Sequence, residues 1–313
     1  MSPQNSELTF TSLPQNAIES SSPGDLARRL TAALRSILPR PGGTGRGGAR
    51  NDRQASRPGH VSIVGAGPGG ADLMTLRAVA RLRQADVVIY DKLVGADIVA
   101  AIPDRSLKIF VGKSRGCHSK SQDEINALLL AHAQRGARVV RLKGGDPFIF
   151  GRGGEEQQFL HAHGIATDVV PGVTAAAGCA AAAGIPLTHR GRAQAVTFLT
   201  GHAQDGEPDL PWRDLVRGGQ TLVVYMGVAT APVIARRLME NGADPATPVA
   251  VVENGTLSGQ VIGRGELGDL PGVLARNVVT GPAVIIIGAV AALPPSHVPE
   301  ALPSHALLED IPS

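Results

Sequence analysis

From residue 60 onward, short apolar runs alternate with segments that have the apolar spacing of amphipathic helices. Apolar runs of this length, rich in β-branched residues and bounded by glycine or polar residues, predict buried strands. Five such runs lie at 60–65, 86–90, 107–111, 138–142 and 166–170. Helical patterns lie between them at about 72–84, 95–101, 121–135 and 153–163. This alternation is typical of a parallel sheet that has helices on both faces.

The alternation starts again after a stretch of small residues at 174–184. Predicted strands follow at 195–199, 221–225, 248–252, 259–263 and 283–288, with a helix at about 230–241. The pattern predicts an α/β protein with two tandem domains, at 60–190 and 191–294, followed by a C-terminal tail at 295–313. The longest apolar run, Ala283 to Leu293, is shorter than the roughly 18 residues that span a bilayer, so we expect no membrane association.

Residues 1–59 differ from the rest because they are rich in Ser, Pro, Gly and Arg and poor in apolar residues. This composition predicts a disordered tail, in which Asp25 caps at most a short, marginal helix. The tail holds eight Arg against four acidic residues, whereas the rest of the chain holds 22 basic and 23 acidic residues. The net charge of +3 therefore belongs to the tail and gives no support to nucleic-acid binding.

Cysteine content and the N-terminal sequence bear on the compartment. Cys117 and Cys179 are far apart and in no CxxC arrangement, so neither a disulfide framework nor a zinc site is predicted. The apolar core of a secretory signal is missing from the N-terminal sequence. We expect a cytoplasmic protein without a metal.

A glycine-rich turn, Gly65-Ala66-Gly67-Pro68-Gly69-Gly70, follows the first predicted strand and satisfies the dinucleotide fingerprint GxGxxG. Asp91 lies at the end of the second strand, where such a protein binds the ribose. A nicotinamide or flavin enzyme is one interpretation. The same turn also suits another adenosine-containing ligand, or close packing alone.

Further glycine-rich or polar segments follow later strands or lie at the domain junction: 144–156, 171–178, 184–190, 225–227 and 253–256. Ligands bind at such places in α/β sheets. Taken together and in this order, these segments resemble the tetrapyrrole methylase family, whose members use S-adenosylmethionine. The resemblance runs from about His60 to Leu293 and is carried by VGAGPGGADLMTL, DVVIYDKLV, VGKSRGCHSKSQDEIN, VVRLKGGDPFIFGRGGEE, VVPGVTAAAGCAAAAGIPLTHRG, VTFLTGH, TLVVYMGV and PVAVVENGT.

The resemblance implies two αβα domains with the methyl donor in the cleft between them, and a homodimer. It also implies two methylations of uroporphyrinogen III, at C2 and C7, giving precorrin-2 and S-adenosylhomocysteine for siroheme or cobalamin synthesis. The motif positions that match the donor-binding set are Pro68, Gly144, Gly145, Asp146, Ile149, Thr174, Ala175, Met226 and Gly255.

Asp91 and Lys113 match the positions that the family uses as proton acceptor and proton donor. Methylation of a pyrrole carbon requires a proton to leave elsewhere, and a carboxylate can act as that general base. The alternatives stay open: Asp91 can be an ordinary acid that caps the turn after a strand, and Lys113 can be a solvated lysine.

A tetrapyrrole with several carboxylates requires cations, which bind them directly or simply lie in water. The candidates near the motif segments are Lys113, Arg115, His118, Arg141, Lys143, Arg152, His189 and Arg190. Of these we assign Arg115, His118, Arg152, His189 and Arg190 to substrate binding.

Two positions depart from the family pattern and keep open a tetrapyrrole-binding protein without turnover. Gly70 replaces the usual acid after GPG, with Asp72 two positions on, and Ala182 stands where relatives often have Tyr. The tail is too short and polar for the dehydrogenase–chelatase module that some relatives carry. The alternative functions are a methylase of a later corrin intermediate, a nicotinamide-dependent oxidoreductase, and a tetrapyrrole-binding protein without turnover.

Overall fold

The computed structural model describes residues 59–112, 120–203 and 206–294. These residues all belong to one unit, residues 51–308. The expectations for the tails, Lys113, Arg115, Cys117 and His118 lie outside the described residues.

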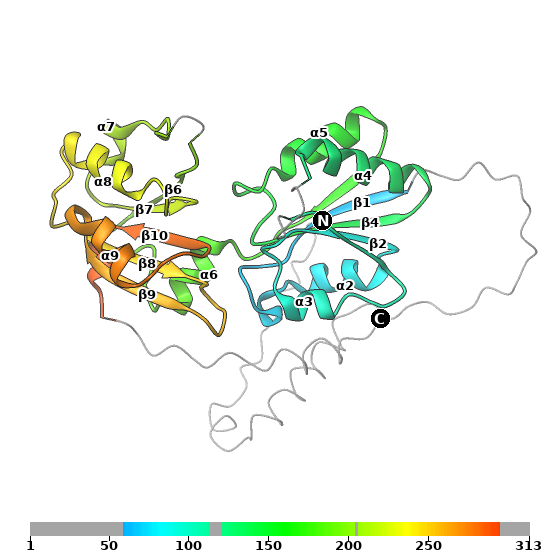
Figure 1. The fold of residues 1–313 in the computed structure, drawn as a ribbon, viewed down its shortest axis with the longest axis horizontal. Helices are drawn as coiled ribbons and strands as arrows, with labels where there is room; N and C mark the ends of the chain where they lie inside the picture. The colour runs from blue at the N-terminus through cyan, green and yellow to red at the C-terminus, as the bar shows by residue number, and fades with distance from the viewer. Residues whose placement is uncertain (1–58, 113–119, 204–205, 295–313) are drawn as a thin grey trace, which may run out of the picture. The chain divides into compact units, whose positions relative to one another are not determined.

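The first sheet is parallel throughout and has the order β3-β2-β4-β1-β5. Its strands are β1 (His60–Gly65), β2 (Val87–Tyr90), β3 (Leu107–Phe110), β4 (Arg138–Lys143) and β5 (Ala166–Val170). Helices α2 (Leu76–Gln84) and α3 (Ala96–Ala100) cover one face, and α4 (Gln122–Gln134) and α5 (Gly153–Ala162) cover the other (Figure 1).

Each face of this sheet has its own core because successive strand residues point to opposite faces. In β1, Val64 packs with Leu82 of α2 and Ile98 of α3, whereas Ile63 packs with Leu129 of α4. Burial on both faces explains why the inner strands β1 and β2 are nearly continuous apolar runs and not alternating ones.

The second sheet is mixed and has the order β6-β7-β10-β8-β9. Its strands are β6 (Ala195–Thr200), β7 (Gln220–Tyr225), β8 (Pro248–Glu253), β9 (Val261–Glu266) and β10 (Ala283–Ile287). Strands β6 and β7 are parallel, whereas β10 is antiparallel to both of its neighbours and β8 is antiparallel to β9. Residues 254–260, which connect β8 to β9, are too few for the crossover that two parallel strands need. The alternation of strands and helices in this half of the sequence therefore does not correspond to a second parallel sheet.

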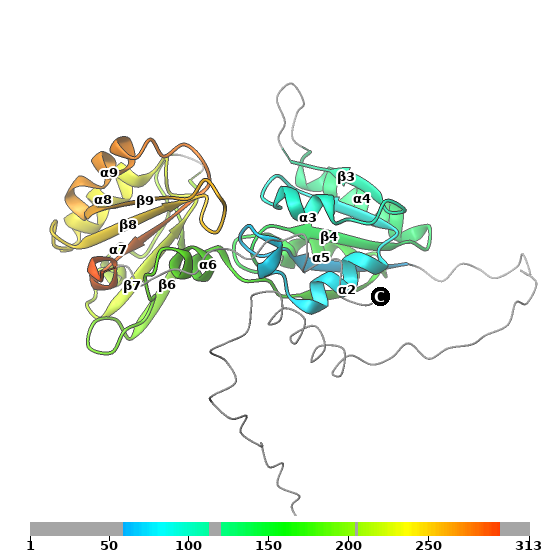
Figure 2. The same ribbon diagram turned by 90° about the horizontal axis from the view of Figure 1, so that it is seen from below.

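One face of the second sheet packs against α7 (Trp212–Leu215), α8 (Ala231–Glu240) and α9 (Leu270–Arg276). The other face packs against α6 (Ala175–Ala182), as Figure 2 also shows, and against the short helix η4 (Ala289–Ala292). Helix α6 lies in the small-residue stretch at 174–184, where the sequence pattern predicted no helix. The fold itself, two αβα domains in tandem, agrees with the prediction.

Asp168 connects three elements of the first domain. It lies on β5 and accepts hydrogen bonds from Ser62 Oγ of β1 (2.6 Å) and Arg81 Nε of α2 (3.0 Å), and it also pairs with His60 Nε2. Burial by itself raises the pKa of this carboxyl, but the hydrogen bonds from Ser62, His60 and Arg81 outweigh it and hold the pKa below its usual value. The charged carboxylate is therefore favoured in the folded state.

We expect Asp168→Asn to lower the free energy of unfolding by about 1.5–3 kcal/mol, the usual contribution of hydrogen bonds to a charged group. A carboxyl whose pKa is lowered by folding contributes stability above its unfolded pKa of about 3.9, and this is lost as the pH falls through the lower, folded pKa. Urea unfolding at neutral and acidic pH measures both effects. Asp214→Asn, which removes only an exposed pair with Arg217, is the control and is expected to cost less than about 0.5 kcal/mol; equal losses in the two variants would contradict the prediction.

Candidate functional site

Three loops meet with their backbones in contact where the strands of the first sheet end. Gly67 and Gly145 exchange two backbone hydrogen bonds, N to O, of 3.2 and 2.6 Å. A Cβ on Gly65 would lie 2.5 Å from Gly172 N, and one on Gly172 would lie 2.3 Å from Gly145 O. Glycine is needed here because no side chain fits between the loops.

The glycine-rich turn is not a dinucleotide site. Two of its backbone N–H groups are already used, since Ala66 N donates to Lys143 O and Gly67 N to Gly145 O, and Ala71 N just after it donates to the Asp97 carboxylate. Helix α2 begins later, at Leu76, where Thr75 caps it, so the turn does not present a long helix N-terminus to a pyrophosphate. In addition, β4 lies between β1 and β2, unlike the dinucleotide-binding strand order 3-2-1-4-5-6.

Asp146, expected to bind the donor, holds two loops together. Its Oδ1 accepts from Phe148 N (2.9 Å) and its Oδ2 from Gly172 N (3.1 Å). Both carboxylate oxygens are therefore engaged by backbone, and the loop that contains Ile149 is fixed by them. Sequence alone did not separate this loop-organising role from direct ligand contact.

The glycine-rich turn and the segment after β8 both pack against small residues of helix α6. Pro68 packs against Gly178, where a Cβ would lie 2.3 Å from the proline Cγ. Gly255 packs against Cys179, whose Sγ would lie 2.4 Å from a Cβ at 255. The predicted donor residues Pro68 and Gly255 are thus placed on adjacent residues of one helix.

Two further donor candidates, Thr174 and Met226, lie next to Tyr225, a residue that the sequence analysis did not assign to the site. The phenol oxygen lies 2.6 Å from Thr174 Oγ1 and accepts a hydrogen bond of 2.9 Å from Ala176 N. Met226, which follows Tyr225, is half-exposed with a φ of 54°, a conformation that is costly for a residue with a side chain. A side chain at Gly145 would project beside Ala175, whose N would lie 3.6 Å from the Cβ.

Asp91 lies directly after β2 and its side chain is 25% exposed. Its Oδ1 accepts from Leu93 N (3.1 Å), which is the turn-capping contact of the structural alternative. Its Oδ2 lies 3.3 Å from Arg141 Nη2. Leu93 in turn packs on Gly144, where a Cβ would be 2.5 Å from the leucine Cβ. The carboxylate is thus held next to the predicted donor loop and is accessible from solvent.

Arg141 and Lys143 were candidates for substrate cations, but the structure buries both in an ion cluster with Glu156. Glu156 is fully buried, and its Oε1 accepts from Arg141 Nε (3.1 Å), Lys143 Nζ (3.0 Å) and Gln122 Nε2 (3.2 Å). Burial lowers the pKa of Lys143, and the nearby Arg141 lowers it further, although Glu156 opposes both. These strand residues point into the layer under α4 and α5, so they do not reach a substrate.

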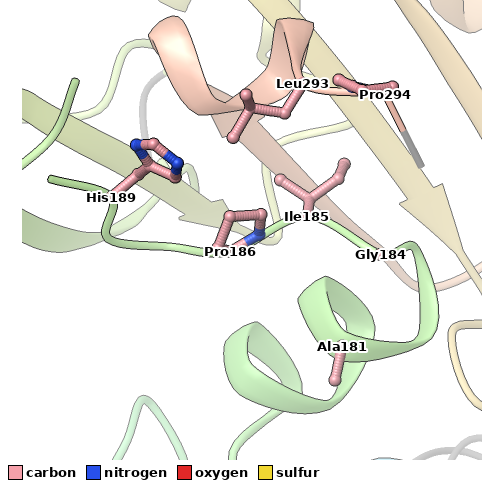
Figure 3. Close-up of a pocket in the computed structure, with 7 residues that line it drawn as sticks. All are labelled: Ala181, Gly184, Ile185, Pro186, His189, Leu293 and Pro294. Atoms are coloured by element: carbon pink, nitrogen blue, oxygen red, sulfur yellow. The ribbon is translucent and has the colours of Figure 1, made fainter. Parts of the chain in front are cut away.

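The candidate substrate residues that the structure describes lie on the surface in two places. Arg152 is exposed, with a φ of 60°, and pairs with Glu155 at 2.6 Å. Exposed His189 donates a hydrogen bond from Nδ1 to the Arg190 carbonyl oxygen (2.8 Å). His189 lines a hollow of about 470 Å³ together with Ala181, Gly184, Ile185, Pro186, Leu293 and Pro294. Figure 3 draws these residues as sticks.

The structure also places the two departures from the family pattern. A Cβ at Gly70 would lie 2.4 Å from Asp72 Oδ1, so the carboxylate of Asp72 occupies the space next to residue 70. Ala182 ends α6, and its carbonyl accepts from Gln260 Nε2 at 3.1 Å.

Other features bear on the remaining alternatives. Burial raises the pKa of the Cys179 thiol to about 11, which fits a packing residue and not a nucleophile. Among residues 59–112, 120–203 and 206–294, three or more His, Cys, Asp or Glu side chains do not gather as a metal site would require. No helix in those ranges is long and apolar enough to cross a bilayer.

The two sheets, their order and the strand-end loops together define a known class of protein. The chain belongs to the Tetrapyrrole (Corrin/Porphyrin) Methylases, which match residues 60–271. It is 54% identical to the siroheme synthase of Azotobacter vinelandii over 235 residues, and 52% identical to that of Chromobacterium violaceum over 239 residues. These matches cover 75% and 76% of this chain but 51% of each relative, so the chain spans about half the length of these curated relatives.

Among solved structures, the chain is similar to the uroporphyrin-III C-methyl transferase of Thermus thermophilus complexed with S-adenosylhomocysteine. That match has 42% identity and a TM-score of 0.65, and it covers 74% of this chain and 98% of that one. A cobalt precorrin-4 methyltransferase matches with 28% identity and a TM-score of 0.67, over 75% of this chain and 96% of that one. The fold is therefore shared within the family, while the sequence is closer to the Thermus enzyme than to the cobalt precorrin-4 enzyme.

Proposed function

We propose that this chain is a methyltransferase that transfers methyl groups from S-adenosylmethionine to C2 and C7 of uroporphyrinogen III. The products are precorrin-2, for siroheme or cobalamin synthesis, and S-adenosylhomocysteine. The observation that carries the proposal is the 42% identity to the Thermus uroporphyrin-III C-methyl transferase over 98% of that chain. Because the siroheme synthases are about twice as long, the proposal concerns methyl transfer alone.

The donor-binding residues that we propose fit a ligand held largely by backbone groups. Gly145, at a φ of 68°, leaves space beside Ala175 N that a side chain would fill, and Thr174 precedes the first turn of α6. Pro68, Gly144, Asp146, Ile149, Met226 and Gly255 complete the set. When bound, the donor supplies a methyl group that its positive sulfonium already activates. The loops around it align the nucleophile and exclude water.

We assign the general-base role to Asp91. Each carboxylate oxygen has two lone pairs, so Oδ1 and Oδ2 can each take a proton while they accept from Leu93 N and Arg141. These two contacts fix the orientation of the carboxylate, and its partial exposure allows a substrate to reach it. In this proposal Lys113 polarises a neighbouring position of the tetrapyrrole, and one proton is lost to Asp91 for each methyl group gained.

Cationic side chains near these loops would bind the carboxylates of the substrate. We propose Arg152, His189 and Arg190, together with Arg115 and His118, for this role. Arginine suits it because its planar guanidinium binds a carboxylate through two hydrogen bonds. We further propose that the enzyme acts as a homodimer in the cytoplasm; the family resemblance supports the dimer, and the low cysteine content supports the compartment.

Incubation with uroporphyrinogen III and isotopically labelled S-adenosylmethionine tests the proposed reaction. We expect two labelled methyl groups per tetrapyrrole, counted by mass spectrometry, because both C2 and C7 react. Parallel incubations contain later corrin intermediates or no tetrapyrrole. Methylation of a later corrin without methylation of uroporphyrinogen III would overturn the proposed substrate. Equilibrium dialysis that shows tight NAD binding and no S-adenosylmethionine binding would overturn the reaction class.

A further inference from the structure

Tyr225 caps a helix that is distant from it in sequence. Thr174 is the N-cap residue of α6, but its side chain accepts no hydrogen bond from the helix. The N–H of Ala176, in the first turn, instead donates to the phenol oxygen of Tyr225 at the end of β7. A first-turn N–H needs such an acceptor because it has no partner within its own helix. Tyr225 therefore takes over the capping role and connects α6 to β7.

The hydroxyl of Thr174 belongs to the same arrangement. It lies 2.6 Å from the Tyr225 oxygen, and either hydroxyl can donate in this pair. Burial raises the pKa of the Tyr225 phenol, so the phenol keeps its proton at neutral pH. The orientation of the Thr174 side chain is thus set by Tyr225.

The ring of Tyr225 also contacts the loop that follows β4. Phe150 packs on it with ring centroids 5.1 Å apart, and Phe198 of β6 packs at 5.9 Å in an edge-on geometry. Phe150 has a φ of 53°, and Met226 next to Tyr225 has a φ of 54°. Such conformations are unfavourable for residues with a side chain and persist only where the surroundings hold them. Aromatic contacts of this kind help to hold Phe150 in place.

We infer that Tyr225 is a positioning residue for the methyl donor. It contacts or adjoins three of the segments that we propose for donor binding, at 144–150, at 174–176 and at Met226. The inference rests on the proposed function. The phenol oxygen orders the start of α6 and Thr174, and the ring orders the loop at Phe150, so Tyr225 sets donor affinity without touching the reacting atoms.

Tyr225→Phe tests this inference because it removes one oxygen and keeps the ring. We expect the Kd for S-adenosylhomocysteine and the KM for S-adenosylmethionine to rise about tenfold, which corresponds to about 1.4 kcal/mol. The kcat at saturating donor should change less than about twofold, since uniform binding is lost and not transition-state binding. Tyr90→Phe, at the only other tyrosine, is the matched control and should leave the Kd unchanged.

Calorimetric titration of the wild-type full chain with S-adenosylhomocysteine separates the two possible failures. If the wild-type chain does not bind S-adenosylhomocysteine, the proposed function is overturned. If the wild-type chain binds and the Tyr225→Phe variant has the same Kd, only the positioning role of Tyr225 is overturned. A lowered kcat of the variant at unchanged KM would also overturn that role. If thermal unfolding shows that Tyr225→Phe does not fold, Phe198→Leu replaces it. This variant loosens the ring from the side of β6, and an unchanged Kd there would equally overturn the inference.

Discussion

Replacing Asp91 with asparagine is expected to lower the rate of methyl transfer by about 10²–10⁴-fold, the usual contribution of a positioned general base. Asparagine has the shape of aspartate and keeps an oxygen for the hydrogen bond from Leu93 N. It loses the negative charge beside Arg141 and the capacity to take a proton at neutral pH. Donor binding should be preserved, because the glycine loops that we assign to it are held by backbone contacts that do not involve Asp91.

Single-turnover kinetics measure this rate, and titration with S-adenosylhomocysteine measures donor binding on the same sample. Asp104→Asn is the matched control, since its fully exposed carboxylate pairs only loosely with Lys108 at 3.6 Å. An Asp91→Asn enzyme with wild-type turnover would show that the carboxylate only caps the turn after β2. Asp91→Ala separates the two roles further, because it also removes the contact with Leu93.

The positions of most strands could be predicted because each strand leaves a short run of apolar or β-branched residues in the sequence. Strand β1 at 60–65 agrees with its predicted bounds, since burial on both faces selects a continuous apolar run. Strand β5 at 166–170 also agrees, although it lies at the edge of the sheet and only Val170 in it is buried. Helix α6 was missed because AAAGCAAA has no polar face and so no helical period. Its helical form depends on packing against the second sheet and on a cap supplied by Tyr225.

Some of the site residues could likewise be recognised from the sequence, whereas the role of others depends on contacts that only the fold creates. Gly65, Gly67 and Gly145 could be recognised because close backbone contacts leave a glycine signature in the sequence. The burial of Arg141 and Lys143 could not be recognised, because a cation on a strand that leads to a motif also suits a substrate-binding role. Their partner Glu156 lies on a helix that the chain reaches only after the motif loop, and only the fold brings the three together.

Glu156→Ala is expected to lower the free energy of unfolding by about 3–5 kcal/mol, the usual cost of removing one partner from a buried ion pair. Glu156 is fully buried, and its Oε1 is shared by Arg141 Nε and Lys143 Nζ. Without it, two buried cations lie side by side. Glu155→Ala, at the neighbouring but exposed carboxylate, removes only a surface pair with Arg152 and should cost less than about 1 kcal/mol. Urea unfolding of both variants at neutral pH gives the comparison, and similar losses would contradict it.

The pH dependence of the Glu156→Ala variant tests the cause of the loss. In the native chain the pKa of Lys143 is lowered by burial and by Arg141, and raised only in part by Glu156. Removal of Glu156 should lower that pKa further, so over a wider pH range the unfolded state binds one more proton than the folded state. Stability rises with pH wherever the unfolded state binds more protons. The deficit of the variant relative to wild type should therefore shrink as the pH rises toward the ordinary lysine pKa of about 10.4, because Lys143 loses its proton at a lower pH in the folded variant than in the folded wild type. A deficit that stays constant as the pH rises would mean that lost packing, and not the buried Lys143 cation left without Glu156, destabilises the variant.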